Sequence, residues 1–561
     1  MATWADIQSW QLSYVEEAED LIEAEVREAR EIIADLEHAA NDIRSQGEAP
    51  DRMRQRLTEI QDKLDSRLNE LTEYALATAE LHGYVSRVVA KRKSAWEVAA
   101  EVGYDIPESG LIEPDALDKR FEPVPRKFDE LRDCIDDAVR IATEAEETVG
   151  PRYQALADGQ YVLAEGRHSE SAGLANDANP TWTPEEVSVW WALLSESERE
   201  ALINKDPEKY GNLNGIDMAS RAKANDLVLN GRIDAAGNRI PGTGLIEKTQ
   251  NELDELNQEI DRAGENGQEV SADLLDKQEY LQIRLADLEA IRDQVQGNAG
   301  ATLLVLEPGN LGDNVRAAIA IGDVDNAQHV ATLVPGMGTN CRENGWLNVE
   351  FAKNLKWAAE NFGGAEAGSV ATIAWMGYDA PPDITKTLDP SVMSIDKAEA
   401  GAEKLNGFVT GIHSWRSERG LDVHQSIIPH SYGSTTAGIA MRDIGKGVVD
   451  DLVYTGSPGA GVSSVGTLGV DPEHTWVSAT PHLDAVQGMG PDETFGRDPK
   501  ELEGIGHLSG DTSGGEGYKT GPFHWPNANH SSYFHKPETA DKHNYALEDI
   551  GKVITGTKER Q

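Results

Sequence analysis

The chain has 561 residues, of which 39% are hydrophobic and 27% are charged. That length allows on the order of two to four domains with a sizeable core, at about 150 residues per domain. Its 51 basic and 98 acidic side chains give a formal net charge of −47, which argues against binding a nucleic-acid backbone as the main task. The charge indicates a solvated acidic surface, with adaptation to high salt or a cationic partner as the alternatives.

The two cysteines, Cys134 and Cys341, lie far apart in the chain. Neither has a metal-binding partner at zinc-finger spacing, so we expect no metal, no cofactor and no disulfide framework. The first residues lack the basic and apolar regions of a signal peptide, and no stretch approaches the ~20 apolar residues of a membrane span. The expected location is therefore cytoplasmic, with signal-less, type VII-like secretion as the alternative.

Residues 1–150 predict a helical hairpin or bundle. Apolar residues recur at three- and four-residue steps, typical of one helix face, at Leu57, Ile60, Leu64, Leu68 and Leu71. Gly and Pro in the stretch 44–51 break this pattern, so residues 3–46 and 52–100 are expected to pair, closed by a third helix at 126–150. The hairpin is loosely similar to small helical-hairpin substrates of the actinobacterial type VII secretion route, although its turn lacks their tryptophan. The resemblance implies that residues 1–150 dock a protein partner; a plain helical domain is the alternative.

Composition divides the middle of the chain. Gly, Ala, Asp and Ser dominate residues 151–180, which predicts a linker. Residues 181–244 are expected to form a helical lead-in, and residues 245–298 an inserted hairpin of charged helices with its turn at 264–267. The apolar residues of this hairpin are expected to face one another, with Leu253, Leu256 and Ile260 opposite Leu274, Leu275, Tyr280, Leu281, Leu285, Leu288 and Ile291.

From residue 299 to residue 561 the pattern predicts an α/β domain with a mostly parallel sheet. Short apolar runs alternate with helical patterns, which is typical of such sheets. We expect strands at 302–307, 317–321, 330–334, 370–376, 423–428, 451–455 and 476–479, and helices at 351–362, 398–415, 434–441 and 540–555. Gly-rich stretches between 486 and 530 give no convincing strand.

A serine lies at a sharp turn between one of these strands and the next helix. Ser431 follows the apolar run that ends at Pro429, and Gly433 opens the helical stretch. A strand, a turn carrying a serine and a helix form a nucleophile elbow, which lifts the hydroxyl above the sheet edge. The usual pattern is G-x-S-x-G, and Pro429 stands at its first glycine. Proline has no backbone donor and fixes φ, so the approach to the turn must suit it.

Several further motifs occur in a fixed order around this turn. With them the chain resembles the alpha/beta-hydrolase superfamily, and within it an actinobacterial group of hydrolases of unknown function, the DUF1023 type. The similarity covers roughly 182–230 and 302–555. The stretches that carry it are 211–216 (GNLNGI) with Arg221 and Asn225, 320–323 (AIGD), 334–338 (VPGMG), 373–381 (IAWMGYDAP), 430–434 (HSYGS) and 529–534 (NHSSYF).

The resemblance implies a triad in the chain order serine, acid, histidine. Catalytic groups belong at the carboxyl ends of parallel strands, which favours Asp484, after the strand at 476–479, with Asp492 in reserve. Asp450 and Asp451 stand at the start of their strand and therefore belong to the wrong edge of the sheet. The superfamily places its histidine just before the last helix, where His530 stands. His482, His507, His524 and His535 are the alternatives, and the adjacent His430 is expected to pack against the loop.

An acyl-transfer site also needs donors for the oxyanion. The elbow supplies the Tyr432 N–H, and the loop after the third strand supplies the second, which we predict to be the Met337 N–H. Gly336 and Gly338 let the backbone approach the substrate there. The rival interpretation, a phosphate-binding loop, fails because no Lys-Ser/Thr pair follows. Tyr378, near a strand end, is expected to line the substrate site.

These features together predict a serine hydrolase that cleaves a carboxylic ester through an acyl-enzyme, using Ser431, His530 and Asp484. The expected substrate is a small-molecule or lipid ester. The alternative is an interaction protein or type VII-like secreted effector that docks a partner through residues 1–150 and has weak or no catalysis.

Overall fold

The computed structural model describes residues 2–42, 48–111, 124–160, 177–384, 386–387, 389–520, 524 and 527–560. The chain forms two compact units, Met1–Leu202 and Ile203–Gln561. The division falls within the stretch expected to be a helical lead-in. No helix among the described residues is long and apolar enough to cross a membrane.

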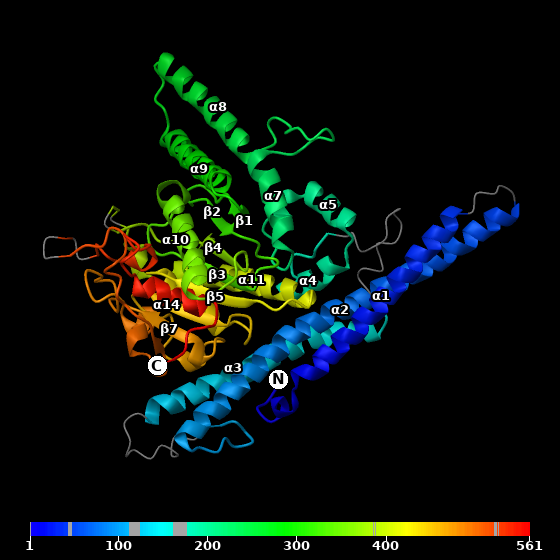
Figure 1. Ribbon diagram of the computed structural model, residues 1–561. Helices are drawn as coiled ribbons and strands as arrows, with labels where there is room; N and C mark the ends of the chain where they lie inside the picture. Colours follow the sequence, from blue (N-terminus) through cyan, green and yellow to red (C-terminus); the bar gives the residue numbers. More distant parts are fainter. Residues whose placement is uncertain are drawn as a thin grey trace. The chain divides into compact units, whose positions relative to one another are not determined.

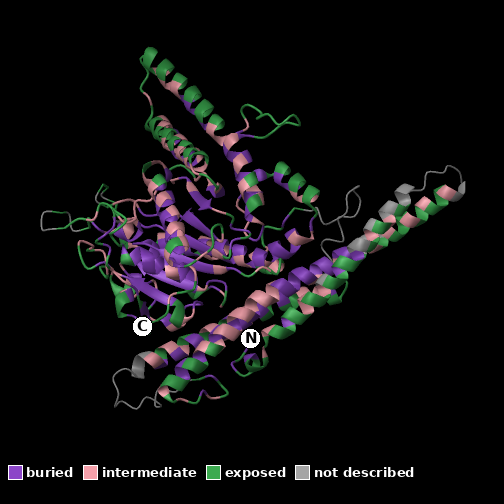
Figure 2. Ribbon diagram, viewed as in Figure 1, coloured by how far each residue is buried: buried purple, intermediate pink, exposed green. Residues whose placement is uncertain are grey.

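The first unit is built from long helices together with shorter ones (Figure 1). They are η1 (Asp6–Ser9), α1 (Leu12–Asp42), α2 (Glu48–Val102), α3 (Val124–Ala157) and α4 (Pro184–Leu193), followed by α5 (Glu196–Lys205) at the boundary. Helix α1 packs along one part of α2, and α3 along another, with Val88, Leu131 and Ile135 in the shared core. Exposed residues are common at the outer end of the α1–α2 hairpin (Figure 2).

The linker expected from residue 151 begins later than predicted, because α3 continues to Ala157. Three contacts hold its last turns in place. Leu156 is buried, the Tyr153 hydroxyl lies 2.7 Å from the Thr78 hydroxyl, and Arg152 pairs with Glu80 at 2.8 Å. These contacts outweigh the helix-breaking tendency of the proline at position 151. Residues 161–176 of the expected linker, and residues 44–47 of the expected turn, lie outside the described residues.

The second unit begins with α6 (Pro207–Tyr210), α7 (Met218–Asn230) and the pair α8 (Leu245–Glu265) and α9 (Ala272–Gly297). Leu253, Leu256 and Leu281 are buried between α8 and α9, as expected. The prediction was wrong for Leu275, which is exposed, and for Leu288 and Ile291, which do not lie opposite Leu253, Leu256 and Ile260. Leu288 and Ile291 join the core over β1 and β2, because the adjoining Asp287 holds α9 against the start of α10: it accepts a 2.8 Å hydrogen bond from the Arg342 N–H.

An eight-stranded sheet forms the centre of the second unit (Figure 1), and the expected mostly parallel α/β fold is confirmed. Its order is β1-β2-β4-β3-β5-β6-β7-β8; β2 pairs antiparallel with β1 and β4, and all the other pairs are parallel. The strands are β1 (Ala301–Glu307), β2 (Arg316–Ile321), β3 (His329–Val334), β4 (Val370–Met376), β5 (His424–Pro429), β6 (Asp451–Thr455), β7 (Thr475–Ser478) and β8 (Gly506–His507).

Two layers of helices cover the sheet. Alternate residues of each central strand point to opposite faces. Val330 and Val334 therefore pack with α11 (Asp396–Glu418) and α12 (Gly433–Arg442), whereas Ala331 and Leu333 pack with α10 (Cys341–Phe362) and α14 (Tyr545–Ile554). Figure 2 shows the strands buried between these layers.

Two sequence-based expectations about this unit need correction. Strand β8 lies in the stretch 486–530, where we expected none. It is two residues long and therefore carries no apolar pattern. A Cβ at Gly506 would lie 2.4 Å from the Trp476 ring, so this position requires glycine. Helix α10 begins at Cys341 instead of residue 351, because the Asn340 side chain caps it by accepting a 2.8 Å hydrogen bond from the Glu343 N–H.

Candidate active site

The turn between β5 and α12 has the backbone geometry of a nucleophile elbow. Ser431 is buried and has φ 57°, and it is one of two non-glycine residues at positive φ in the described part of the chain. Such a conformation is costly for serine and persists only where neighbours impose it. The Ser431 N–H donates to the Thr455 carbonyl at 3.1 Å, and the His430 N–H donates to the Val334 carbonyl at 2.9 Å. The neighbouring strands β3 and β6 thus hold the strained turn from both sides.

Two glycines allow other backbone to pass close to this serine. A Cβ at Gly433 would lie 2.3 Å from the Val334 carbonyl oxygen, and a Cβ at Gly336 would lie 2.7 Å from Ser431 Cβ. Both distances are too short for any side chain. The elbow and the loop after β3 are therefore in direct contact, with Ser431 at the junction.

Pro429 is accommodated as the last residue of β5. Ladder pairs join β5 to β6 at Ser426 and Ile427, and pairing resumes at a bridge between His430 and Thr455. The missing proline N–H falls in the gap between these pairs. The Pro429 carbonyl accepts a 2.8 Å hydrogen bond from the Thr455 hydroxyl, so the proline is still tied to β6.

Asp484 and His530 meet in the loops that follow β7 and precede α14. His530 Nδ1 donates to Asp484 Oδ1 at 2.8 Å, and the Asp484 side chain is fully buried. The second non-glycine residue at positive φ, Leu483 at 57°, directly precedes the aspartate. Its carbonyl accepts a 3.0 Å hydrogen bond from the Asn529 N–H, so the residues before each partner are themselves joined.

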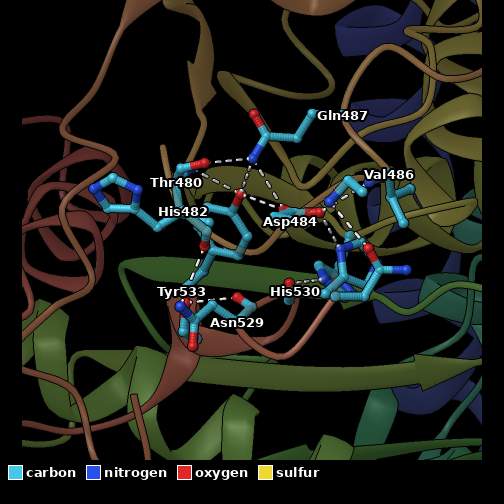
Figure 3. Close-up of polar contacts among 12 residues, drawn as sticks. Thr480, His482, Asp484, Val486, Gln487, Asn529, His530 and Tyr533 are labelled. Atoms are coloured by element: carbon cyan, nitrogen blue, oxygen red, sulfur yellow. Dashed lines mark hydrogen bonds and ion pairs between the residues drawn. The ribbon is translucent and has the colours of Figure 1, made fainter. Parts of the chain in front are cut away.

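The carboxylate of Asp484 is surrounded by donors (Figure 3). Its Oδ2 accepts hydrogen bonds from the Tyr533 hydroxyl at 2.8 Å and from Gln487 Nε2 at 3.1 Å. Burial by itself would raise the pKa of Asp484, but the hydrogen bond and charge of His530, together with these two donors, lower it below its ordinary value. The aspartate is therefore held ionised, and it fixes the proton of His530 on Nδ1.

His430 supports this arrangement from behind. Its Nε2 lies 2.7 Å from the His530 carbonyl oxygen, and the two rings are 4.5 Å apart between centroids. A carbonyl oxygen only accepts, so Nε2 of His430 carries a proton. Burial and the adjacent His530 lower the pKa of His430 to about 3, which keeps this ring neutral. His430 therefore positions the His530 backbone and has no free nitrogen on that side to act as a base.

The end of strand β6 lies against both the elbow and the histidine–aspartate pair. The Thr455 carbonyl accepts from the Ser431 N–H at 3.1 Å, and Gly456 follows directly. A Cβ at Gly456 would lie 3.1 Å from the His530 ring and 3.2 Å from Asp484 Oδ2. One dipeptide thus contacts the elbow with its first residue and the histidine–aspartate pair with its second. Nδ1 of His530 is used by the aspartate, so Nε2 is the ring nitrogen that Asp484 leaves free.

The loop after β3 holds the residues expected to bind the oxyanion and the substrate. Gly336 is buried and lies against the elbow, since its Cβ would be 2.8 Å from the Tyr432 nitrogen. Within the described ranges, neither the Tyr432 N–H nor the Met337 N–H donates to another protein atom. Gly338 has φ 74°, which favours glycine. Tyr378 is buried and donates to the Pro335 carbonyl at 2.8 Å, so its hydroxyl supports this loop.

The alternative histidines and acids of the sequence lie elsewhere. Exposed positions are occupied by Asp492, His482, His507 and His524, and His535 packs its ring 5.4 Å from that of Phe351. Asp451 sits at the opposite, amino-terminal edge of the sheet, where Oδ2 lies 2.9 Å from His424 Nε2. No group of three metal-binding side chains occurs among the residues that the structure describes.

Several residues of this site were missed by sequence reasoning. Tyr533 and Gln487 contact the aspartate, Asn529 joins the two loops, and Gly456 makes room for the histidine. Tyr533 and Asn529 lie within the motif 529–534, which is the signal that could have indicated them. Gln487 and Gly456 follow a predicted site residue and a predicted strand, but nothing in the local sequence marks them.

Comparison with known proteins identifies the family of the chain. A family model described as alpha/beta hydrolase matches residues 311–492, which include Ser431 and Asp484. The uncharacterized protein Rv0963c of Mycobacterium tuberculosis is 32% identical over 236 residues, covering 41% of this chain and 84% of that protein. The chain belongs to the alpha/beta hydrolases.

Other relatives are longer than the matched region. The uncharacterized protein Rv2079 of Mycobacterium tuberculosis is 29% identical over 377 residues, which cover 63% of this chain and 54% of that protein. The chain thus spans about half the length of this relative. The uncharacterized protein Mb0988c of Mycobacterium bovis is 32% identical over 236 residues and is covered to 84%. No solved structure matches the chain significantly.

Proposed function

We propose that the chain is a serine hydrolase that cleaves carboxylic esters through an acyl-enzyme. In this proposal Ser431 is the nucleophile, His530 the general base and Asp484 the acid that orients it. The observation that carries the proposal is the 2.8 Å contact between His530 Nδ1 and Asp484 Oδ1, which the end of β6 links to an elbow serine at positive φ. The family supports hydrolysis as the reaction class, and the triad and the ester substrate are inferences from the side chains.

The proposed acylation moves one proton and one electron pair. His530 Nε2 takes the Ser431 hydroxyl proton as Oγ forms a bond to the substrate carbonyl carbon, and the carbonyl electron pair moves onto oxygen. The Tyr432 and Met337 N–H groups donate to this oxyanion. As the pair returns, the bond to the alcohol breaks, and the alcohol leaves with the proton from His530. Water then repeats these steps on the acyl-enzyme, releasing the carboxylic acid.

The charge of Asp484 matters most when His530 is protonated. A buried carboxylate stabilises the imidazolium that forms at each transfer, and it keeps the imidazole in the tautomer that leaves Nε2 free. The hydrogen bonds from Tyr533 and Gln487 satisfy the second carboxylate oxygen, so the group can stay ionised in a buried place. A small-molecule or lipid ester is the substrate class that we propose.

Replacement of Ser431 tests the proposal directly. Ser431→Ala in the full chain is expected to abolish hydrolysis of short p-nitrophenyl esters and labelling by a fluorophosphonate. Ser417→Ala, at an exposed position on α11, is the control and should keep both. Labelling or turnover that persists in Ser431→Ala would exclude this serine as the nucleophile.

A further inference from the structure

One side chain holds the peptide group that joins Gly336 to Met337. The Thr339 hydroxyl donates a 2.7 Å hydrogen bond to the Gly336 carbonyl oxygen. A trans peptide is planar, so its C=O and the N–H of the following residue point in opposite directions. Fixing the direction of the Gly336 carbonyl therefore fixes the direction of the Met337 N–H. In the part of the chain that the structure describes, this N–H has no acceptor within the protein.

The same peptide begins beside the nucleophile. A Cβ at Gly336 would lie 2.7 Å from Ser431 Cβ and 2.8 Å from the Tyr432 nitrogen, so the peptide that carries the Met337 N–H begins beside both the serine and the other candidate donor. We propose that Thr339 is a positioning residue for the oxyanion site, whose hydroxyl aims the Met337 N–H at the oxygen that gains charge when Ser431 attacks. This inference rests on the proposed serine hydrolase function.

The remainder of the loop is held by other contacts. The Gly338 N–H donates to the Pro381 carbonyl at 2.8 Å, and the Gly338 carbonyl accepts from Asn344 Nδ2 at 2.9 Å. Asn344 Oδ1 also accepts from the Asn340 N–H at 3.0 Å. Loss of the Thr339 hydroxyl therefore leaves the path of the loop intact and frees one peptide group to rotate. The expected effect is local and concerns the orientation of a single donor.

An oxyanion donor acts mainly in the transition state. The carbonyl oxygen of a bound ester carries little charge, and full negative charge develops only when the Ser431 oxygen adds to the carbon. Misdirection of the Met337 N–H is therefore expected to lower kcat while KM changes little. A threonine that contacts the ground-state substrate would instead raise KM, and the two roles are distinguishable by kinetics.

A pair of substitutions in the full chain tests the role. Thr339→Val keeps the shape of the side chain and removes the hydroxyl, and Thr339→Ser keeps the hydroxyl. With p-nitrophenyl butyrate, kcat of the valine variant is expected to fall about 10- to 100-fold, less than the loss of a donor outright, and the serine variant should recover most of it. A trifluoromethyl ketone, which forms a tetrahedral adduct with the serine, should lose affinity by a similar factor.

Each outcome bears on the proposal. Unchanged kcat in Thr339→Val, or a raised KM with unchanged kcat, would overturn it, as would an equal loss in Thr339→Ser. If the valine variant fails to fold, as judged by its melting temperature, Thr339→Ala replaces it with the same expectations. Activity that survives in Ser431→Ala would refute the proposed function itself. An inactive Ser431→Ala beside a fully active Thr339→Val would refute only the role of Thr339.

Discussion

The Tyr533 hydroxyl donates a 2.8 Å hydrogen bond to Asp484, on the carboxylate oxygen that His530 does not use. The same hydroxyl accepts from the Thr480 N–H at 2.9 Å. The tyrosine thus links the aspartate to the backbone just after β7. This link gives the candidate triad a support that can be removed without touching the three side chains themselves.

Tyr533→Phe is expected to weaken catalysis and move its pH dependence. Hydrogen bonds lower the pKa of Asp484, so removing one raises that pKa toward its ordinary value. Because Asp484 and the base that it orients take up protons as a coupled pair, a more basic carboxylate lets the pair take up its first proton at a higher pH, and the acid limb of the kcat/KM profile shifts upward in pH. At neutral pH we expect a loss of about tenfold, equivalent to one hydrogen bond to a charged group. The profile is measured with a p-nitrophenyl ester.

The control for this change is Tyr545→Phe on α14, where the tyrosine is exposed. This variant should keep both the rate and the profile of the parent chain. A Tyr533→Phe enzyme with a lower rate but an unshifted acid limb would mean that the tyrosine supports only the packing of the loop.

Gly456→Ala is expected to remove activity by displacing the histidine. The added Cβ would lie 3.1 Å from the His530 ring and 3.2 Å from Asp484 Oδ2, which is tighter than ordinary contact. A misplacement of this kind can cost about 10²-fold in rate. The glycine also has φ 54°, so alanine adds backbone strain of about 1 kcal/mol.

Gly447→Ala separates strain from crowding. This glycine has φ 87°, and a Cβ there would meet nothing within 4 Å. Backbone strain should lower the free energy of unfolding in urea by a similar amount in both alanine variants. Only Gly456→Ala should lose hydrolysis of a p-nitrophenyl ester. Equal activity in the two variants would show that the His530 ring does not need its observed position.

The parts of this site that could be predicted from the sequence are those that follow from local patterns and from the order of residues along the chain. The strand that ends at Pro429 and the helix that begins at Gly433 are local patterns, and the turn between them follows from their closeness in the chain. Asp484 followed from the rule that catalytic groups lie at the carboxyl ends of strands, and His530 from its motif and its place before α14. All three residues were thus identified as candidates from order along the chain.

The contacts that support these residues depend on distances that no local pattern records. Gln487 reaches Asp484 because of the path of an irregular loop, and Gly456 is required because His530, 74 positions later, packs onto it. Strand β8 escaped notice because two residues carry no alternation of apolar and polar side chains. The start of α10 was missed because its cap, Asn340, follows the Gly-rich loop that ends β3 and outweighs the weak apolar pattern of the first turns.

His430→Phe is expected to change how stability depends on pH. Burial and the adjacent His530 lower the pKa of His430 in the folded chain from its ordinary 6.5 to about 3. The unfolded chain therefore binds a proton at His430 as the pH falls below 6.5, while the folded chain does not. His430 contributes stability above this pH, and the contribution is lost progressively toward pH 3, by up to about 1.4 kcal/mol per pH unit.

The free energy of unfolding of the phenylalanine variant should lack this dependence on pH. This variant should be less stable than the parent at neutral pH, because the His530 carbonyl loses its donor, and the difference should narrow toward lower pH. Urea unfolding at several pH values above about 4 measures this difference. Asp484, whose pKa is lowered in the folded chain, reduces the free energy of unfolding only below that pH, where the unfolded chain protonates its carboxyl group. His482→Phe, at an exposed position, is the control. Parallel pH curves for parent and His430→Phe would contradict the assignment of a neutral His430.

Pro429→Ala is expected to leave the elbow working. The hydrogen bonds that hold the turn come from the His430 N–H to Val334 and from the Ser431 N–H to Thr455, and neither uses residue 429 as a donor. The Pro429 carbonyl accepts from the Thr455 hydroxyl, which an alanine at this position can also do. The change should lower the unfolding free energy by at most about 1 kcal/mol, because the unfolded chain gains freedom, and kcat/KM should stay within about threefold of the parent. A tenfold or greater fall in kcat/KM without loss of folding would instead mean that the proline ring itself sets the φ of Ser431.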